Sequence, residues 1–266
     1  MPPVSRIDSR QHAAVKRCRA LAHERDDQFV LLDGEHLVVE ALRADVPIEM
    51  LLTDDTPRPD LTSRADNKGV VRYEGTSAVL EAASPVRTPS GVVALARWSP
   101  MALEAVLDTG PALVVGLVGV QDPGNVGAVI RAADALGASG VVILEGTADP
   151  GHWKSLRGAM GSTFRIPIAR DTLDRTIARA RQQTVLVAAT VASGGAPIER
   201  VTFGPAMLLL LGNEGAGLSA ATVARSDVQL TIPMRAGVDS LNVSVTAALC
   251  LWQARLARAA ANGTSV

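Results

Sequence analysis

The sequence predicts an α/β protein in which a small α/β domain precedes a larger domain built on a parallel sheet. From residue 112 onward, near-continuous apolar runs alternate with helical patterns, which is typical of parallel strands covered by helices on both faces. Residues 1–98 alternate shorter strand and helix patterns. Hydrophobic residues make up 47% of the chain and charged residues 20%, which excludes a disordered protein. We therefore expect domains at 1–98 and 112–266, joined by a linker at 99–111.

The first domain is expected to contain several short elements in alternation. A Pro- and Asp-rich stretch at 54–66 predicts a loop, and Pro100 and Pro111 bound the expected linker around a short helical pattern. The expected helices are 8–23, 35–43 and 77–83, and the expected strands are 29–32, 48–53, 70–73 and 91–96.

The second domain has longer apolar strands and more regular alternation. The expected strands are 112–120, 140–144, 164–168, 185–191, 206–211 and 228–232, and the expected helices are 125–136, 153–160, 173–181, 220–225 and 242–260. Ligands of such sheets bind at the carboxyl ends of the strands. The unusual loops of the sequence all follow strand ends, so we expect the functional site there.

Composition narrows the class of protein further. The two cysteines, Cys18 and Cys250, lie far apart in helical segments, which argues against disulfides and for a reducing compartment. The four histidines lack metal-ligand spacing, so no metal is expected. The apolar runs are too short to span a membrane and no signal pattern opens the chain, so we expect a cytoplasmic protein without membrane contact.

The overall net charge of −1 hides a basic N-terminal segment. Residues 1–25 carry six Lys and Arg against two acids, and Lys16, Arg17 and Arg19 form the centre of this excess. Such a cluster is a candidate RNA-binding surface. The alternative is a solvated helix face, and the charge pattern alone does not separate the two.

The first notable loop, residues 122–137, directly follows a strand. Pro123 and Gly124 predict a turn, and Asn125 is a suitable N-cap for the next helix. Arg131 lies about 9 Å further along that helix, and its long side chain can point back toward the strand end. The alternative is an ordinary capped helix with a solvated arginine.

The second loop, residues 208–219, runs from a buried strand into three glycines around Glu214. Backbone without side chains lets a ligand approach closely, and Gly212 is the first such position. The spacing fits neither a dinucleotide-binding fingerprint nor a phosphate-binding P-loop. The alternative is a glycine-rich turn without a ligand.

The third loop, residues 232–249, leads through Ser240 and Asn242 into a long C-terminal helix. Either residue is a good N-cap, which accounts for both without any function. Capping does not explain why all three loops end strands of one sheet.

Together the three loops resemble, in order and spacing, the motifs of the SpoU/TrmH branch of the SPOUT RNA methyltransferases. The resemblance covers residues 112–260, including the segment 155–168. The first domain resembles a substrate-binding domain similar to an RNA-binding ribosomal protein, through residues 29–42 and 89–96. Relatives often have His-Gln before the glycine that matches Gly91, where this chain has Pro89 and Ser90.

The resemblance implies a deep trefoil knot, a homodimer packed through the knotted domain, and S-adenosyl-L-methionine as the methyl donor. It implies a cofactor site formed by Thr190, Gly212, Ile232, Met234 and Leu241. It also implies catalytic roles for Arg131, Asn125, Glu214, Ser240 and Asn242. In addition, an apolar stripe at Val243, Ala247, Leu251 and Ala254 is expected to face the partner.

The implied reaction is methylation of an RNA ribose 2′-hydroxyl. Because a guanidinium does not lose its proton in proteins, Arg131 is expected to hold a phosphate and stabilise charge on the attacking oxygen. Asn125 is expected to orient Arg131 or the ribose, and Glu214 to fix the loop or Arg131. Ribosomal RNA is the expected substrate. The alternatives are transfer RNA, a non-catalytic RNA-binding protein on the same fold, and a nucleotide-dependent oxidoreductase.

Overall fold

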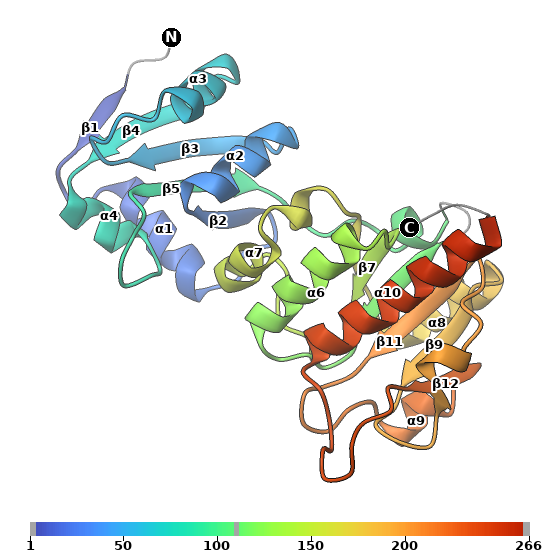
Figure 1. Ribbon diagram of the computed structural model, residues 1–266. Helices are drawn as coiled ribbons and strands as arrows, with labels where there is room; N and C mark the ends of the chain where they lie inside the picture. The colour runs from blue at the N-terminus through green and yellow to red at the C-terminus, as the bar shows by residue number, and fades with distance from the viewer. Residues whose placement is uncertain (1–3, 109–111, 263–266) are drawn as a thin grey trace. The chain divides into compact units, whose positions relative to one another are not determined.

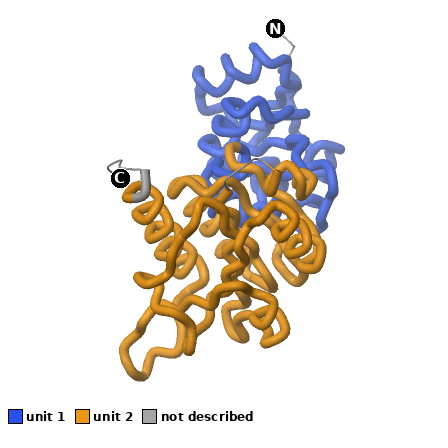
Figure 2. The backbone as a smooth tube through the Cα atoms, turned by 90° about the vertical axis from the view of Figure 1, so that its right-hand side faces the viewer, with its two compact units in different colours: residues 1–99, 151–164 blue, residues 100–150, 165–266 orange. Residues whose placement is uncertain are grey.

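The computed structural model describes residues 4–108 and 112–262, with the side chains of residues 261 and 262 left out. The chain forms two compact units (Figures 1 and 2). Unit 1 comprises Met1–Ser99 and Gly151–Phe164, and unit 2 comprises Pro100–Pro150 and Arg165–Val266. Residues 151–164, expected in the second domain, belong to unit 1, although the residues on either side of them belong to unit 2.

A five-stranded mixed sheet forms the centre of unit 1, in the order β1-β4-β3-β5-β2. β5 runs antiparallel to β2 and β3, whereas β1, β3 and β4 pair in parallel. The strands are β1 Ser5–Ile7, β2 Phe29–Asp33, β3 Ile48–Thr53, β4 Val71–Gly75 and β5 Val92–Arg97.

Helices cover both faces of this sheet. Alternate residues of a strand point to opposite faces, so Val30 and Leu32 join the core that includes α2 and α3, while Leu31 joins the core that includes α1 and α4. The helical elements are α1 Ala13–His23, α2 Glu35–Arg43, α3 Pro59–Asn67, α4 Ser77–Ala83, α7 Trp153–Ala159 and η1 Ser162–Phe164.

α7 is anchored in unit 1 by one apolar and one charged contact. Leu156 is buried in the same core as Val30 and Leu32. Arg157 Nη1 donates to Asp33 Oδ2 at 2.8 Å, and Ser84 Oγ donates to the other carboxylate oxygen at 2.8 Å. The Asp33 side chain is 1% exposed, so Arg157 supplies the counter-charge of a buried carboxylate.

Unit 2 contains a seven-stranded sheet in the order β10-β12-β9-β11-β6-β7-β8. Every pairing in it is parallel, which confirms the parallel sheet predicted from the sequence. The strands are β6 Leu113–Leu117, β7 Gly140–Ile143, β8 Ile168–Arg170, β9 Leu186–Thr190, β10 Ala196–Pro197, β11 Met207–Leu211 and β12 Val228–Thr231.

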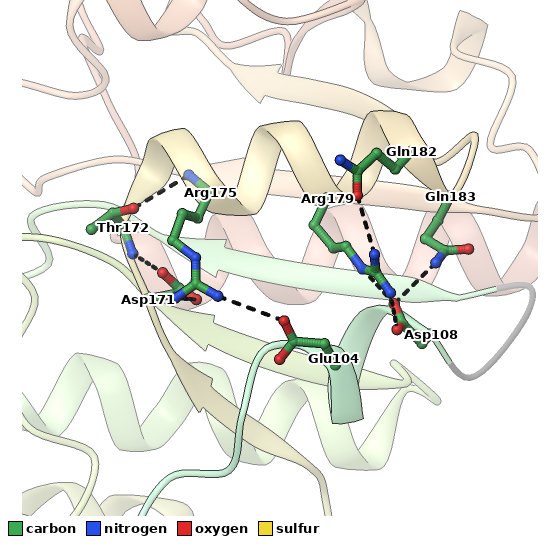
Figure 3. A network of polar contacts seen from close by, with 8 residues as sticks. All are labelled: Glu104, Asp108, Asp171, Thr172, Arg175, Arg179, Gln182 and Gln183. Carbon is green, nitrogen blue, oxygen red and sulfur yellow. Dashed lines mark hydrogen bonds and ion pairs between the residues drawn. The ribbon is translucent and has the colours of Figure 1, made fainter.

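The helices of unit 2 pack on this sheet, with α6 and α10 against each other (Figure 1). α5 and α8 share an apolar core. Two ion pairs join α8 to the segment around α5: Arg179 pairs with Asp108, and Arg175 Nη2 lies 3.6 Å from Glu104 Oε1 (Figure 3). These ion pairs tie α8 to the segment before β6. The helical elements are α5 Glu104–Leu107, α6 Pro123–Ala135, α8 Leu173–Gln182, η2 Ile198–Arg200, α9 Ala220–Val223 and α10 Val243–Asn262.

Three local expectations were wrong. The expected loop at 54–66 contains all of α3 except its last residue, because Pro59 suits a first helical turn and Leu61 and Ala65 bury one face. The strand expected at 164–168 begins only at Ile168, since Pro167 has no N–H to pair. Residues 100–108 of the expected linker pack into unit 2, and 109–111 lie outside the described residues.

The C-terminal helix also differs from expectation in which face it buries. Val243, Ala247, Leu251 and Ala254, expected to face a partner, are buried within the protomer. The exposed large apolar side chains of α10 lie on another stripe. No helix in the described ranges combines the length and apolarity that crossing a bilayer requires. The trefoil knot implied by the resemblance stays a prediction.

Chain order places a topological switch between β6 and β11. From β6 the chain proceeds to β7 and β8 on one side, then crosses to β9, after which β11 inserts next to β6. In open parallel sheets, the crevice at such a switch is where ligands bind. The loops after β6 and β11 carry the first two sequence motifs.

Candidate active site

A chain of side-chain hydrogen bonds joins the three loops that the sequence singled out. Asn242 Nδ2 donates to Asn125 Oδ1 at 3.0 Å, and Asn125 Nδ2 donates to Glu214 Oε1 at 3.0 Å. These residues precede α10, lie in the first turn of α6, and follow β11, respectively. Three segments far apart in the sequence therefore meet at one edge of the sheet.

Asn125 is available for this role because another residue caps α6. The expected N-cap was Asn125, but the N-cap is Asp122, whose side chain accepts from Asn125 N–H at 2.9 Å. Pro123 occupies the first turn, where its missing N–H costs nothing. The Asn125 side chain is thus free to point toward the neighbouring loops.

Asn242 performs two functions at once. Its Oδ1 accepts from Ser244 N–H at 2.8 Å and from Ser244 Oγ at 2.6 Å, as a residue capping a helix does. Its amide nitrogen remains for Asn125. Capping and site assembly are therefore compatible at this position.

Glu214 is the anionic end of the chain. Besides Asn125, the backbone N–H groups of Gln121 and Asp122 donate to its carboxylate, each at 3.3 Å. Burial acts to raise the pKa of Glu214, but these hydrogen bonds outweigh it and hold the pKa below its ordinary value. The carboxylate therefore stays ionised and binds the loop after β6 to the loop after β11.

A cavity of about 310 Å³ lies beside the hydrogen bonds that join Asn242, Asn125 and Glu214. Its walls come from the segments that follow β9, β11 and β12 and from the start of α10. Among the predicted residues, Glu214 and Ser240 line it together with all five expected cofactor contacts: Thr190, Gly212, Ile232, Met234 and Leu241. The structure thus brings the expected cofactor residues to a single cavity.

Gly212 is required by the loop itself. A Cβ added there would lie 2.4 Å from Gly217 C and 2.4 Å from Leu218 N, both of which are backbone atoms. The loop after β11 folds back so closely that no side chain fits at its first residue. Thr190 is also internally satisfied, since its hydroxyl donates to Leu210 O at 3.1 Å.

Two residues of the site have no role predicted from the sequence: Asn213, which stands beside Glu214 in the glycine-rich loop, and Asp239. Asn213 Nδ2 donates to Gly119 O at 2.8 Å, and its Oδ1 accepts from the N–H groups of Gly215 and Ala216. An asparagine between glycines after a buried strand was the available signal. Asp239 lines the cavity, but its exposed loop gave no pattern.

Arg131 is exposed on α6 and does not line the cavity. Within residues 4–108 and 112–262, no hydrogen bond or ion pair reaches its guanidinium. The expected contacts of Asn125 or Glu214 with Arg131 are therefore not made; both side chains bind each other instead.

The basic segment of unit 1 divides into two classes. Lys16 and Arg19 are exposed on α1. Arg17 pairs with Glu49, and its guanidinium carbon lies 4.2 Å above the centre of the Phe29 ring. Arg17 thus has a structural role in unit 1, whereas its two neighbours are open to solvent.

The chain matches known proteins along nearly its whole length. Residues 112–252 match the SpoU rRNA Methylase family. A protein of Bacillus subtilis named 23S rRNA (guanosine(2553)-2'-O)-methyltransferase RlmP is 34% identical, over 95% of this chain and 100% of the relative. A protein of Mycobacterium tuberculosis named as an uncharacterized tRNA/rRNA methyltransferase is 32% identical, over 90% of this chain and 79% of the relative.

Solved structures of methyltransferases also resemble this chain over nearly its whole length. An AdoMet-bound rRNA methyltransferase from Sinorhizobium meliloti superposes with a TM-score of 0.85 at 30% identity, covering 95% of this chain and 98% of that one. The SpoU methyltransferase AviRb from Streptomyces viridochromogenes, in complex with AdoMet, gives 0.83 at 27% identity, covering 94% and 100%. The chain therefore belongs to the SpoU rRNA methylase family.

Proposed function

We propose that this protein transfers a methyl group from S-adenosylmethionine to a ribose 2′-hydroxyl of RNA. The hydrogen-bond chain from Asn242 through Asn125 to Glu214 carries the proposal, because it assembles three strand-end loops beside a cavity. The family and the full-length rRNA methyltransferase relative support this reaction.

We place the cofactor in this cavity. Its volume lies at the lower end of the range of small-molecule pockets. Backbone edges at Gly212 and Leu241 suit the hydrogen-bonding groups of an adenine, and Leu211, Leu230 and Ile232 supply apolar wall. When bound, S-adenosylmethionine supplies a methyl group on a sulfonium, which leaves as a neutral thioether.

The chain's own residues then position the attacking oxygen. Arg131 holds a phosphate of the RNA and stabilises negative charge as it develops on the oxygen, which its free guanidinium suits. Ser240 and Asn242 shape the pocket for the hydroxyl. Asn125 and Glu214 are positioning residues that act through Asn242 and through the two loops they join.

Ribosomal RNA is the substrate class that we favour over transfer RNA. The support is that the Bacillus subtilis relative, which this chain matches from end to end, is named for 23S rRNA. Unit 1 is the candidate RNA-binding domain, and Lys16 and Arg19 are two of its exposed cations, with Arg17 beside them. We further propose a cytoplasmic location, in keeping with two buried free cysteines.

The experiment is mapping of 2′-O-methyl sites in total RNA from cells with and without the protein, beside transfer by the purified enzyme. Arg131→Ala should lower single-turnover transfer by a factor of about 10² or more while cofactor affinity is kept. Arg200→Ala, which removes an exposed arginine of η2, is the matched control and should transfer normally.

The other readings predict different results. RNA binding without transfer would indicate a non-catalytic RNA-binding protein, and a methyl group found only in transfer RNA would replace the ribosomal substrate. Binding of NAD in place of S-adenosylmethionine would favour an oxidoreductase. Full transfer by Arg131→Ala would remove the role of Arg131.

We also propose a homodimer formed through α10. Four of its large apolar side chains are 36–45% exposed, and their spacing of four, three and four residues puts them on one helix face: Val245, Leu249, Trp252 and Leu256. A closed two-fold dimer is the commonest way for a soluble protein to cover such a face.

Sedimentation at micromolar concentration tests this. The protein should be a dimer, and Trp252→Glu should make it a monomer, because a charge on this stripe opposes its burial. Gln253→Glu adds the same charge beside the stripe and is the control. A monomeric wild type would refute the dimer.

A further inference from the structure

The cavity walls are unusual in their charge. Among the described residues that line the cavity, only Glu214 and Asp239 carry ionisable side chains. Lysine, arginine and histidine are missing from this set of lining residues. The formal charge of the lining is therefore negative, which favours a cationic ligand.

The two carboxylates differ in how they are used. Both oxygens of Glu214 accept hydrogen bonds, from Asn125 and from the backbone at 121 and 122. Asp239 is exposed, and in the part of the chain that the structure describes it has no hydrogen bond or ion pair. Asp239 therefore brings to the cavity a negative charge that takes part in no ion pair with the described residues.

Asp239 lies next to the residues that we assign to the reacting hydroxyl. It immediately precedes Ser240, in the segment that leads through Asn242 to α10. The apolar walls come instead from strand ends, at Leu211, Leu230 and Ile232. A ligand with one apolar end and one charged end would fit with its charged end toward Asp239.

The charge of the cofactor changes during the proposed reaction, on which this inference rests. S-adenosylmethionine carries an ammonium, a carboxylate and a sulfonium, for a net charge of about +1 at neutral pH. Methyl transfer forms the O–C bond and breaks the S–C bond, whose electron pair stays on sulfur, while the hydroxyl proton passes to solvent. The product, S-adenosylhomocysteine, is therefore neutral overall.

We propose that Asp239 is the counter-charge to the sulfonium and makes the site prefer the methyl donor over the spent product. The methyl group is bonded to the sulfonium, so this charge must lie beside the hydroxyl, near Ser240 and Asp239. The attraction vanishes once the methyl group has left, which aids exchange of product for fresh donor. A solvent-exposed carboxylate that faces a single positive charge changes affinity by a factor of about 2–5.

Titration calorimetry with three ligands tests the proposal. Asp239→Asn should weaken binding of S-adenosylmethionine about threefold, and should leave the affinities for S-adenosylhomocysteine and 5′-methylthioadenosine nearly unchanged. Asp239→Glu keeps the charge and should keep the preference. Asp55→Asn makes the same change at an exposed position of unit 1 and should alter none of the three affinities. Among these variants, only Asp239→Asn should be inhibited more strongly by S-adenosylhomocysteine at a fixed concentration of S-adenosylmethionine.

The outcomes are distinguishable. Equal losses for donor and product would mean that Asp239 acts on the ammonium or on loop shape, and would overturn the proposal. An unchanged donor affinity in Asp239→Asn would overturn it as well. A wild-type protein that binds none of the three ligands would refute the proposed function itself, whatever the variant does.

Discussion

Asn125 has only one usable side-chain orientation. Its Oδ1 must face the Asn242 amide and its Nδ2 must face the Glu214 carboxylate. Asn242 is fixed in the same way, because its Oδ1 accepts from Ser244. Hydrogen bonds that end on a charged group strengthen one another, so the chain favours one arrangement of the three loops.

The ionised state of Glu214 makes this arrangement sensitive to acid. Because its pKa in the folded protein is lowered, Glu214 contributes stability that is fully present above its ordinary pKa of 4.5 and is lost as the pH falls through the lowered value. We expect Glu214→Gln to be less stable than wild type at pH 7, and the difference to shrink below about pH 4.5.

Denaturant unfolding of both proteins between pH 8 and 3 measures this difference. Other carboxylates with lowered pKa, such as Asp54 and Asp108, are present in both proteins and cancel. Glu199→Gln, an exposed change, is the control. A difference that stays constant down to pH 3 would contradict the prediction.

Gly212 tests how tightly the loop after β11 is folded. We expect Gly212→Ala to lower stability by about 1–3 kcal/mol, because the new Cβ would collide with backbone rather than with a movable side chain. Gly204→Ala is the control, since nothing lies within 4 Å of a Cβ there. Thermal unfolding compares the two, and equal melting temperatures would show that the loop yields easily.

At the scale of single residues, sequence reasoning found the members of the site better than their partners. Asn125, Glu214 and Asn242 could be placed together because each follows a strand of one predicted sheet. Their contacts depend on side-chain directions that a pattern does not contain. Asp122 replaced Asn125 as the N-cap for this reason, and Asn125 came to bind Glu214 rather than Arg131.

Elements were predictable where periodicity was strong. The helices at 35–43 and 77–83 and the strand at 48–53 have the bounds that the sequence predicted. Short elements were missed: β1 and β10 span three and two residues, too few to show a repeat. α3 was missed because Pro and Asp residues, which suit turns, suit a first helical turn equally well.

α7 is an element whose charged contact can be tested. We expect Arg157→Ala to destabilise unit 1 by about 1–2 kcal/mol, because the buried Asp33 carboxylate loses its counter-charge. The cost is below that of a fully buried pair, since the Arg157 side chain is 48% exposed. Hydrogen exchange should show faster opening in β2.

Arg6→Ala is the matched control for Arg157→Ala. It also removes an arginine from an ion pair of unit 1, but the Arg6 and Asp8 side chains are 73% and 69% exposed, so its loss should cost less than about 0.5 kcal/mol. Unchanged exchange in β2 of Arg157→Ala would show that Ser84 alone satisfies Asp33.

For the whole molecule, we propose that unit 1 binds RNA and unit 2 transfers the methyl group, so substitutions in unit 1 should change RNA binding without changing transfer. We expect Lys16→Gln with Arg19→Gln to weaken RNA binding at moderate salt and to reduce the salt slope by about 0.7–0.9 for each lost phosphate contact. Arg17→Gln should change the slope less, because Glu49 already neutralises Arg17. Transfer at saturating RNA should be unchanged in every case.

A salt series of RNA affinity, beside single-turnover transfer, measures both quantities. Lys68→Gln is a control that removes a cation paired with Asp45. Loss of transfer at saturating RNA in the double variant would show that the units are not separable in this way.

The two-part organisation itself was visible in the sequence, but the path of the chain between the parts was not. Composition and periodicity change near residue 112, which marked the start of the larger sheet. Nothing in residues 151–164 distinguishes a helix that packs on one sheet from a helix that packs on another. The assignment to unit 1 depends on the tertiary contacts of this segment: Leu156 is buried in the core of unit 1, and Arg157 pairs with Asp33.

The placement of α7 also governs when unit 1 can be completed during synthesis. The ribosome makes residues 100–150 before it reaches the helix that carries Leu156. Until then, the part of the unit 1 core that Leu156 covers stays exposed in the nascent chain. A gene fragment ending at residue 99 encodes an unfinished domain. Exchange of this domain between related enzymes must therefore bring residues 151–164 along with it.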